Sequence, residues 1–398
     1  MSTERSSSTV HILSIAMMGM TVALLPVFLT GALGVHLSAE LAFGATGLGL
    51  AVSAFRLGAT VSSKPMGNLT DRLGANKSLR LGGAIAGVCS LAIAVAARSW
   101  TILVVMLFVA GAGQALAQPA TNRLLLLRIA PNRQGLAFGA KQAATPVASM
   151  IAGLSVPVVA MTLGWRAAYA MVSVIAIVVV AWLGRGRSGP RAQRVVSKVK
   201  AGAQPRWGTL TIVLLAFGFA NASSNAIPAF YVSSAVDAGS SGEIAGTVLA
   251  AGSAVAIVTR IGTGILSDRL VSGHFLLCAA MLAVGSVGLV MLGVGGPVAK
   301  AAGLAIALGG TWGFNGVFWF ALMRSYPRAP GAVTGSVAPG GAVGSTIGPA
   351  LFGVLVDGSG YLAAWIVSAA LAALAAVAMV LVSRMIGNER PGGEAVST

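Results

Sequence analysis

The chain has 398 residues, of which 56% are hydrophobic and 9% are charged, and its mean hydropathy is +0.88. A soluble domain usually carries about a quarter of charged residues, so the composition disfavours a soluble enzyme, a disordered protein and a nucleic-acid binder. The formal net charge of +17 would suggest polyanion binding in a soluble protein. Its meaning here depends on where the cations lie, and the class that remains is the membrane protein.

Apolar segments of about twenty residues, the length that crosses a bilayer, follow one another along the whole chain. The first continues to about residue 35, which is longer than the apolar core of a cleaved signal peptide. Charges, prolines and polar glycine clusters separate twelve segments, which we expect to be transmembrane helices. The expected ranges are 11–35, 46–67, 79–97, 101–127, 135–160, 166–184, 208–233, 243–266, 274–294, 298–323, 331–356 and 361–384.

The basic residues sort to one side of this topology. If the N-terminus is cytoplasmic, twenty of the 26 Lys and Arg residues fall in cytoplasmic connections and tails. The positive-inside rule then explains the net charge without any nucleic acid. We expect a multi-pass protein of the cytoplasmic (inner) membrane with both termini in the cytoplasm and with membrane lipids as its surroundings. The six other cations are Arg98, Arg166 and Lys300 outside, and Arg56, Lys141 and Arg260 within helices.

Residues that interrupt the apolar segments recur at equivalent places in the two halves of the chain, which indicates an internal duplication. At an offset of 196 residues, Gly164 and Trp165 correspond to Gly360 and Tyr361. Parallel repeats of six helices place a central cavity between two halves that rock about a site at mid-membrane. The expected organisation is an N-terminal six-helix bundle (1–184), a basic cytoplasmic linker (185–207), a C-terminal six-helix bundle (208–384) and a cytoplasmic tail (385–398).

The run Gly67-Asn-Leu-Thr-Asp-Arg72-Leu-Gly74, followed by Lys77 and Arg80, resembles the signature of the major facilitator superfamily in the loop between its second and third helices. An echo of this run, from Gly264 to Arg269, stands between the expected helices eight and nine, where that family repeats it. The resemblance covers essentially the whole chain. It implies an all-α membrane protein with twelve transmembrane helices in two pseudo-symmetric six-helix bundles, working as a secondary transporter.

The same resemblance implies a conformational gate, because these motif residues govern switching in the family. An aspartate near a helix end can bind backbone amides or a neighbouring arginine, so a charged latch is expected at the cytoplasmic rim. The alternative is a turn that merely ends a helix. The expected gate residues are Gly67, Asp71, Arg72, Gly264, Asp268 and Arg269.

Arg260 lies eight residues before Asp268, about 12 Å further into the membrane at 1.5 Å per residue. The run from Arg260 to Asp268 is similar to helix eight of monocarboxylate and oxalate/formate transporters. This similarity implies that Arg260 binds a substrate carboxylate, a task that suits the planar fork of a guanidinium. The alternative is a structural role, for instance a bond to exposed backbone carbonyls.

Two further cations and several neutral polar groups are candidates for the same site. Lys141 has Val337 as its counterpart in the second half, and Arg56 lies past mid-membrane by helix rise. Either cation could instead extend its head group to the membrane surface. Amides in spanning helices line cavities or bind other helices. The amide candidates are Gln142, Gln118, Asn225 and Asn315, with Asn122 in a wider group on the fourth helix.

All nine acidic residues can be placed at the membrane edges, so the three intramembrane cations are expected to meet a negative charge on the substrate. We therefore expect a monomeric secondary active transporter of a small organic anion, a carboxylate, with protons or a counter-anion as coupling partner. No phosphate-binding loop or histidine-centred catalytic group is present, and neither enzyme activity nor a cofactor or metal is expected. The alternatives are a proton-linked exporter of drugs or other hydrophobic compounds, which would need an acid in the cavity, and a non-transporting receptor or sensor.

Overall fold

A computed structural model of the chain describes residues 2–129, 137, 140–184, 207–270, 272–326 and 330–388. These residues form helices joined by short turns, and none of them is in a strand. The helices are α1 (Ser2–Ala32), α2 (Gly34–Leu41), α3 (Ala45–Leu73), α4 (Ala75–Ala96), α5 (Trp100–Arg128), α7 (Ala144–Ser155), the π-helical turn η2 (Val156–Ala160), α8 (Met161–Leu163), α9 (Trp165–Gly184), α10 (Trp207–Asp237), α11 (Gly242–Arg269), α12 (His274–Val294), α13 (Pro297–Ser325) and α14 (Pro330–Asn388).

Twelve membrane crossings are present in these residues, as the sequence predicts. The run Ala140–Leu163, which contains α7, η2 and α8, is one crossing. The 59-residue α14 is two crossings, because its backbone kinks at Gly360. The remaining nine are α1, α3, α4, α5, α9, α10, α11, α12 and α13. The first predicted segment, 11–35, is not one helix, because α1 ends at Ala32 and a separate helix α2 begins at Gly34. The bend between α2 and α3 is 112°.

The duplication is visible in the backbone itself. Gly164 and Gly360, which are 196 residues apart, both have positive φ, at 82° and 81°. Glycine adopts this region without the steric cost that a Cβ brings. Tyr169 and Trp365 stand at the same offset, are both fully buried, and bond to Thr30 of α1 and Ser234 of α10 respectively. The sixth and twelfth crossings therefore dock in equivalent ways.

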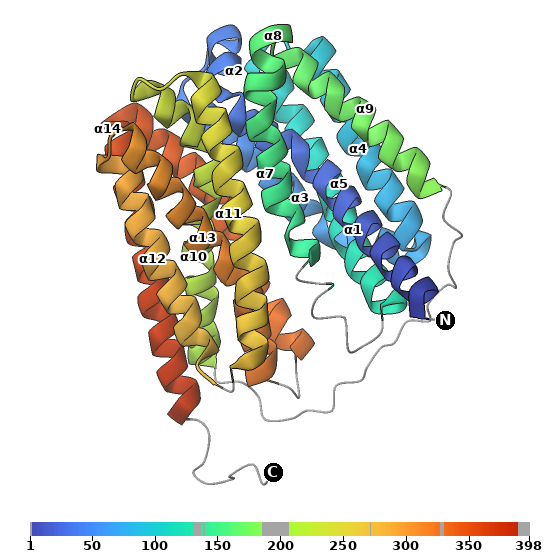
Figure 1. Cartoon of the computed structure of the whole chain (residues 1–398), viewed down its shortest axis with the longest axis vertical. Coiled ribbons are helices and arrows are strands. Elements are labelled where there is room, and N and C mark those ends of the chain that lie inside the picture. The colour runs from blue at the N-terminus through green and yellow to red at the C-terminus, as the bar shows by residue number, and fades with distance from the viewer. Residues whose placement is uncertain are drawn as a thin grey trace.

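The helices from α1 to α9 form one half of the molecule and those from α10 to α14 form the other (Figure 1). The N-terminus and the end of α14 lie at one end, which we call the terminal side (Figure 1). The opposite side carries α2, α8 and the kink of α14. The predicted linker, apart from Trp207, and residues 389–398 of the predicted tail lie outside the described residues.

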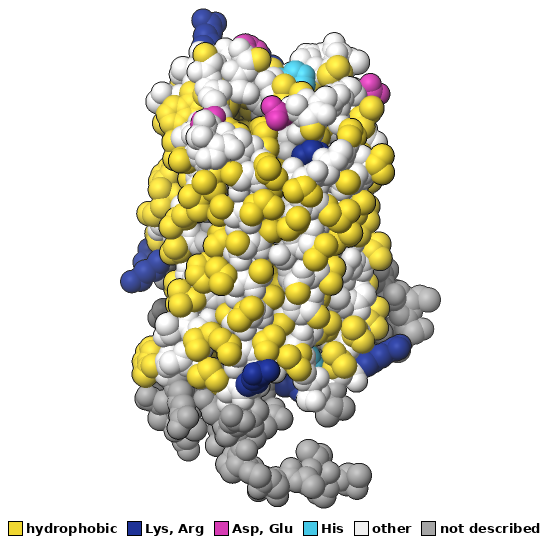
Figure 2. Space-filling model, turned by 90° about the vertical axis from the view of Figure 1, so that its left-hand side faces the viewer, with side chains coloured by type: hydrophobic (Ala, Val, Ile, Leu, Met, Phe, Trp, Pro, Cys, Tyr) yellow, Lys and Arg dark blue, Asp and Glu magenta, His cyan; other side chains and the backbone are white. Residues whose placement is uncertain are grey.

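The surface between the two ends is apolar. Figure 2 shows hydrophobic side chains over the middle of one face, acidic side chains near the opposite side and basic side chains at both ends. Large apolar side chains such as Val88, Val174 and Val258 are more than half exposed. A soluble domain rarely exposes so extensive an apolar surface, and a lipid-facing surface accounts for it.

Candidate transport site

The two halves meet along an antiparallel helix pair that we call the α7–α11 seam. On the opposite side, a Cβ at Gly153 would stand 2.7 Å from the carbonyl oxygen of Gly246, so the backbones are in direct contact. Further toward the terminal side, the Ser253 hydroxyl donates to the Ser149 hydroxyl over 2.9 Å. Small residues permit this close approach of helices in membranes.

A second cross-half pair, the α3–α14 seam, joins α3 to the first limb of α14. A Cβ at Gly49 would stand 2.2 Å from the carbonyl oxygen of Pro349. Beyond this contact, the Asp357 carboxylate accepts hydrogen bonds from the amides of Ala45 (3.0 Å) and Thr46 (2.8 Å). A carboxylate at the first amides of a helix also meets the positive end of the helix dipole. This seam is therefore held by a cap as well as by packing.

The third cross-half contact lies between the two seams, where Gly31 of α1 touches the backbone at Pro228 of α10. Phe28 of α1 also meets Trp312 of α13 edge to face, with ring centroids 5.9 Å apart. By contrast, no described atom lies within 4 Å of a Cβ at Gly67. The contacts between the halves thus reach from the opposite side to the middle of the molecule.

Arg260 lies at the inner end of the α7–α11 seam and bridges the two halves. Its side chain is buried, with 8% of the residue exposed. Its Nε donates to the carbonyl oxygen of Trp312 over 3.0 Å, and its Nη1 donates to the carbonyl oxygen of Gln142 in the other half. The structural alternative, a bond to backbone carbonyls, is what this conformation contains. Both acceptors are neutral, so the guanidinium charge has no counter-charge in these bonds.

Lys141 stands next to the residue that Arg260 contacts. It is 2% exposed, and its Nζ donates to Oδ1 of Asn122 on α5 over 2.7 Å. The side chain therefore does not extend to the surface, and its recorded partner is again a neutral oxygen. Asn122 belonged only to the wider group of amides on the fourth helix, because sequence distance gave no reason to pair it with Lys141.

The structure separates the other predicted site residues. Arg56 is half-buried on α3, away from the seam that holds Arg260. Asn225 turns to its own helix, where its Nδ2 donates to the carbonyl oxygen of Asn221. Gln118 and Asn315 are half-buried, and Gln142 takes part through its backbone carbonyl. The residues brought together are thus Lys141, Gln142 and Arg260.

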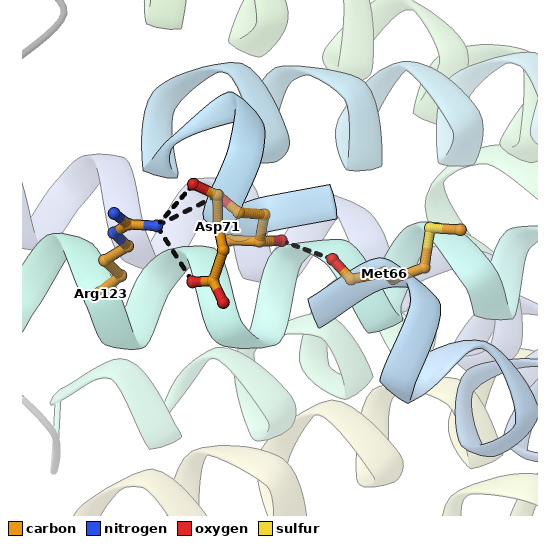
Figure 3. A network of polar contacts seen from close by, with 4 residues as sticks. Met66, Asp71 and Arg123 are labelled. Atoms are coloured by element: carbon orange, nitrogen blue, oxygen red, sulfur yellow. Dashed lines mark hydrogen bonds and ion pairs between the residues drawn. The ribbon is translucent and has the colours of Figure 1, made fainter. Parts of the chain in front are cut away.

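The first gate motif is helical and not a loop, which corrects the prediction from the sequence. Helix α3 continues to Leu73, so Gly67, Asp71 and Arg72 lie in its last turns and only Gly74 makes the turn into α4. The guanidinium of Arg123 on α5 bonds to Oδ1 of Asp71 at 3.2 Å and also donates to the carbonyl oxygens of Thr70 and Asp71 (Figure 3). In this conformation Asp71 is tied within its own half.

The second gate motif repeats this arrangement in part. Gly264, Asp268 and Arg269 lie in the last turns of α11, and no described atom lies within 4 Å of a Cβ at Gly264. Arg324 of α13 donates to the carbonyl oxygen of Leu270 over 3.4 Å, as Arg123 does at the end of α3. The side chain of Asp268 lies outside the described residues. The turn that follows uses Gly273, with φ at 84°, in place of a counterpart to Gly74.

The sequence model of the Major Facilitator Superfamily matches residues 8–344. The chain belongs to this superfamily. A comparison with curated protein sequences finds no significant match.

Solved structures of the superfamily fold support this assignment. The chain is similar to a bacterial homologue of the human lysosomal transporter Spinster, at 15% identity in both of the structures compared. In the inward-facing, unoccupied conformation the TM-score is 0.76, over 98% of this chain and 99% of that one. In the inward-facing, occupied conformation the TM-score is 0.77, over 97% and 99%. At this identity the likeness establishes the fold, and superfamily membership establishes a multi-pass membrane transporter.

A hollow among α11, α12 and α13 lies away from the seams. Its volume is about 430 Å³, and its walls are apolar side chains and glycines of α11, α12 and α13, with the hydroxyls of Thr259 and Thr263. Both hydroxyls donate to carbonyls of their own helix. None of the predicted site residues lines this hollow, so it does not replace the seam as the candidate site.

Proposed function

We propose that this superfamily member is a secondary active transporter that moves a small organic anion, a carboxylate, across the cytoplasmic membrane by rocker-switch alternating access. The observation that carries the proposal is the pair of buried cations at the seam. Arg260 and Lys141 are each 8% exposed or less, and the acceptors recorded for them are two backbone carbonyls and one amide.

No acidic side chain among the described residues pairs with either cation, and in this proposal the substrate supplies the negative charge. A Lys or Arg at mid-bilayer costs about 2.5 to 3.5 kcal/mol or more on insertion scales, and such residues mark substrate pathways. Carbonyl and amide oxygens accept from some of these donors but leave the charge in place. A carboxylate satisfies the donors of a guanidinium in bidentate fashion and also neutralises it.

The described acidic side chains lie near helix ends, at a distance along the helices from this seam. Glu40 accepts from the indole of Trp165 and from Arg166, and Asp71 pairs with Arg123. Asp237 ends α10, Glu243 begins α11 and Asp357 caps α3. A proton-linked exporter of hydrophobic compounds would use a cavity acid as its proton carrier, and no described acid stands in that place. The placement favours anion transport.

Substrate binding would also change how the halves are joined. The Nη1 donor of Arg260 that holds the Gln142 carbonyl is the donor that a carboxylate would take. An anion on Arg260 therefore competes with the innermost contact of the α7–α11 seam, and differential binding of this kind is what shifts a conformational equilibrium. Protons or a counter-anion would provide the energy for net movement.

The orientation follows from the charge distribution. The outer ends of the first and last helices lie on the terminal side, and the sequence assigns twenty of the 26 basic residues to the side of the termini, so we place this side in the cytoplasm. The cross-half contacts lie on the opposite side and in the middle, and the conformation described is then the one open to the cytoplasm.

The test is uptake and counterflow in proteoliposomes with a panel of monocarboxylates and dicarboxylates. We expect the protein to carry at least one of them, and Arg260→Ala and Lys141→Met to lower its initial rate at least about tenfold. Arg260→Lys, which keeps the charge but not the fork, is expected to lie between. Arg98→Ala, at an exposed arginine outside the seams, is the matched control and should leave the rate unchanged. Transport of lipophilic cations with full activity in Arg260→Ala, or no transport of any anion, would contradict the proposal.

A further inference from the structure

The duplication relates each contact position of one seam to a position of the other seam. We call each such pair of facing positions a rung. The offset of 196 takes Gly153 of α7 to Pro349 of α14. The two copies of the gate motif, at Gly67 and Gly264, are 197 residues apart, and this offset takes Gly49 of α3 to Gly246 of α11. These four residues make the backbone contact in each seam. These backbone contacts are therefore equivalent in the two seams, and the correspondence can be extended inward.

The next rung places Arg56 between the halves. Ser253, which bonds to Ser149 across the α7–α11 seam, corresponds to Arg56, and Ser149 corresponds to Ser345. Helix geometry gives the same result independently. Arg56 follows Gly49 by seven residues, which is almost two full turns, so both side chains lie within about 20° on the same face of α3. That face is the one that meets α14 at Gly49.

Arg56 differs from Arg260 and Lys141, because its buried Nε has no hydrogen-bond acceptor. Its Cζ lies over the Phe55 ring, 5.7 Å from the centroid. The Ser345 hydroxyl on the facing limb donates to the Ala342 carbonyl of its own helix. The half-buried guanidinium thus keeps a buried donor without an acceptor, so this position is suited to a guest that brings negative charge.

We propose that Arg56 forms a second anion subsite, which holds a second carboxylate group nearer the opposite side of the membrane than the group at Arg260. The inference rests on the proposed function for the chemistry of the ligand. Arg260 stands seven residues beyond Ser253, the counterpart of Arg56, and seven residues are about 10 Å of helix. The two sites lie on different seams and at different depths, so one short carboxylate cannot occupy both. The second group is either a second monocarboxylate or the far end of a long dicarboxylate.

Equilibrium binding to the purified full-length protein distinguishes these sources. Titration calorimetry would use straight-chain monocarboxylates and α,ω-dicarboxylates of four to ten carbons. If two separate anions bind, the wild-type protein takes up two monocarboxylates per chain and Arg56→Gln takes up one. If one long dianion binds, the wild type prefers the long dicarboxylate over the monocarboxylate of equal length by at least about tenfold, and Arg56→Gln loses that preference.

Two controls show whether any loss is specific. Arg56→Lys keeps the positive charge and should retain the second subsite with weaker binding, whereas Arg98→Gln should bind as the wild type does. Thermal unfolding without anion checks the fold. Arg56→Gln should unfold at the same temperature as the wild type or higher, because it removes a half-buried charge whose Nε has no acceptor.

The outcomes separate this inference from the proposed function. If Arg56→Gln binds every anion as the wild type does while Arg260→Ala does not, the second subsite is wrong and the transport site stands. If anions bind and the effect of Arg56→Gln is present, but proteoliposomes carry none of them, the subsite stands and the proposed function is wrong. If no anion binds to the wild-type protein, both are overturned.

Discussion

The α7–α11 seam and the α3–α14 seam are related by the same duplication, yet different chemistry holds them. Both contain a glycine in direct contact with the backbone of the other half. From there the α7–α11 seam continues inward through a serine pair to Arg260. The α3–α14 seam is instead fastened at its outer end, where Asp357 caps the first amides of α3.

The comparison teaches that the backbone contact is common to both seams while the polar groups have diverged. Arg260 has Ser63 as its counterpart, Ser253 has Arg56, and Lys141 has Val337. Close packing of two helices requires small residues at the same place in each seam. The positions of the charges are not subject to that requirement, so the space between two symmetric halves can bind an asymmetric substrate.

The largest effect on transport and conformation is expected from adding a side chain at the glycine contact that both seams share. Gly49→Ala places a Cβ 2.2 Å from the Pro349 carbonyl oxygen, and Gly246→Ala places one 2.6 Å from the Gly153 carbonyl oxygen. Neither backbone can move without parting the halves, so we expect each variant to lose most transport activity and to shift toward the conformation open on the opposite side. Spin labels at Arg98 and Ala238, in a variant lacking Cys89 and Cys278, would report the shift as a longer distance.

The matched control for these variants is Gly208→Ala. Gly208 begins α10, and no described atom stands within 4 Å of a Cβ there. Unchanged label distances and transport in both Gly49→Ala and Gly246→Ala would show that the glycine contacts do not hold the two halves together on the opposite side.

An intermediate effect is expected from Asp357→Ala, which touches the α3–α14 seam alone. The substitution removes two hydrogen bonds to the start of α3. Loss of a capping side chain costs about 1 kcal/mol, so the ratio of the two conformations should change about fivefold. The same label pair measures this change, and Asp357→Asn, which keeps one acceptor oxygen, should change it less. An equal effect of both substitutions would argue against the cap.

The smallest effect is expected from Ser253→Ala in the α7–α11 seam. Interhelical hydrogen bonds in membrane proteins contribute about 0.6 kcal/mol on average, and the Gly153 and Arg260 contacts on either side remain. Transport should fall by less than about threefold, and the protein should still depend on Arg260. A loss as large as that of Gly246→Ala would show that the serine pair, and not the glycine contact, holds this seam.

Local pattern predicted the twelve crossings within a few residues. The length and apolarity of each segment are properties of consecutive residues, and the backbone in a bilayer must satisfy its hydrogen bonds within such a segment. Gly164 and Gly360, which the sequence comparison identified as equivalent residues, share a backbone conformation with positive φ. The helical state of Asp71 was missed, because a run of polar residues at a helix end has the composition of a loop.

The sequence by itself determined the crossings, the duplication and the presence of three cations deep in apolar segments, because each of these is a matter of local composition or of comparison along the chain. Only the tertiary structure decided which oxygens those cations meet. Arg260 bonds to a carbonyl 118 residues away and Lys141 to an amide 19 residues away. A partner of this kind depends on how helices pack across the two halves, and the periodicity of a single helix carries no information about the face that lies against it.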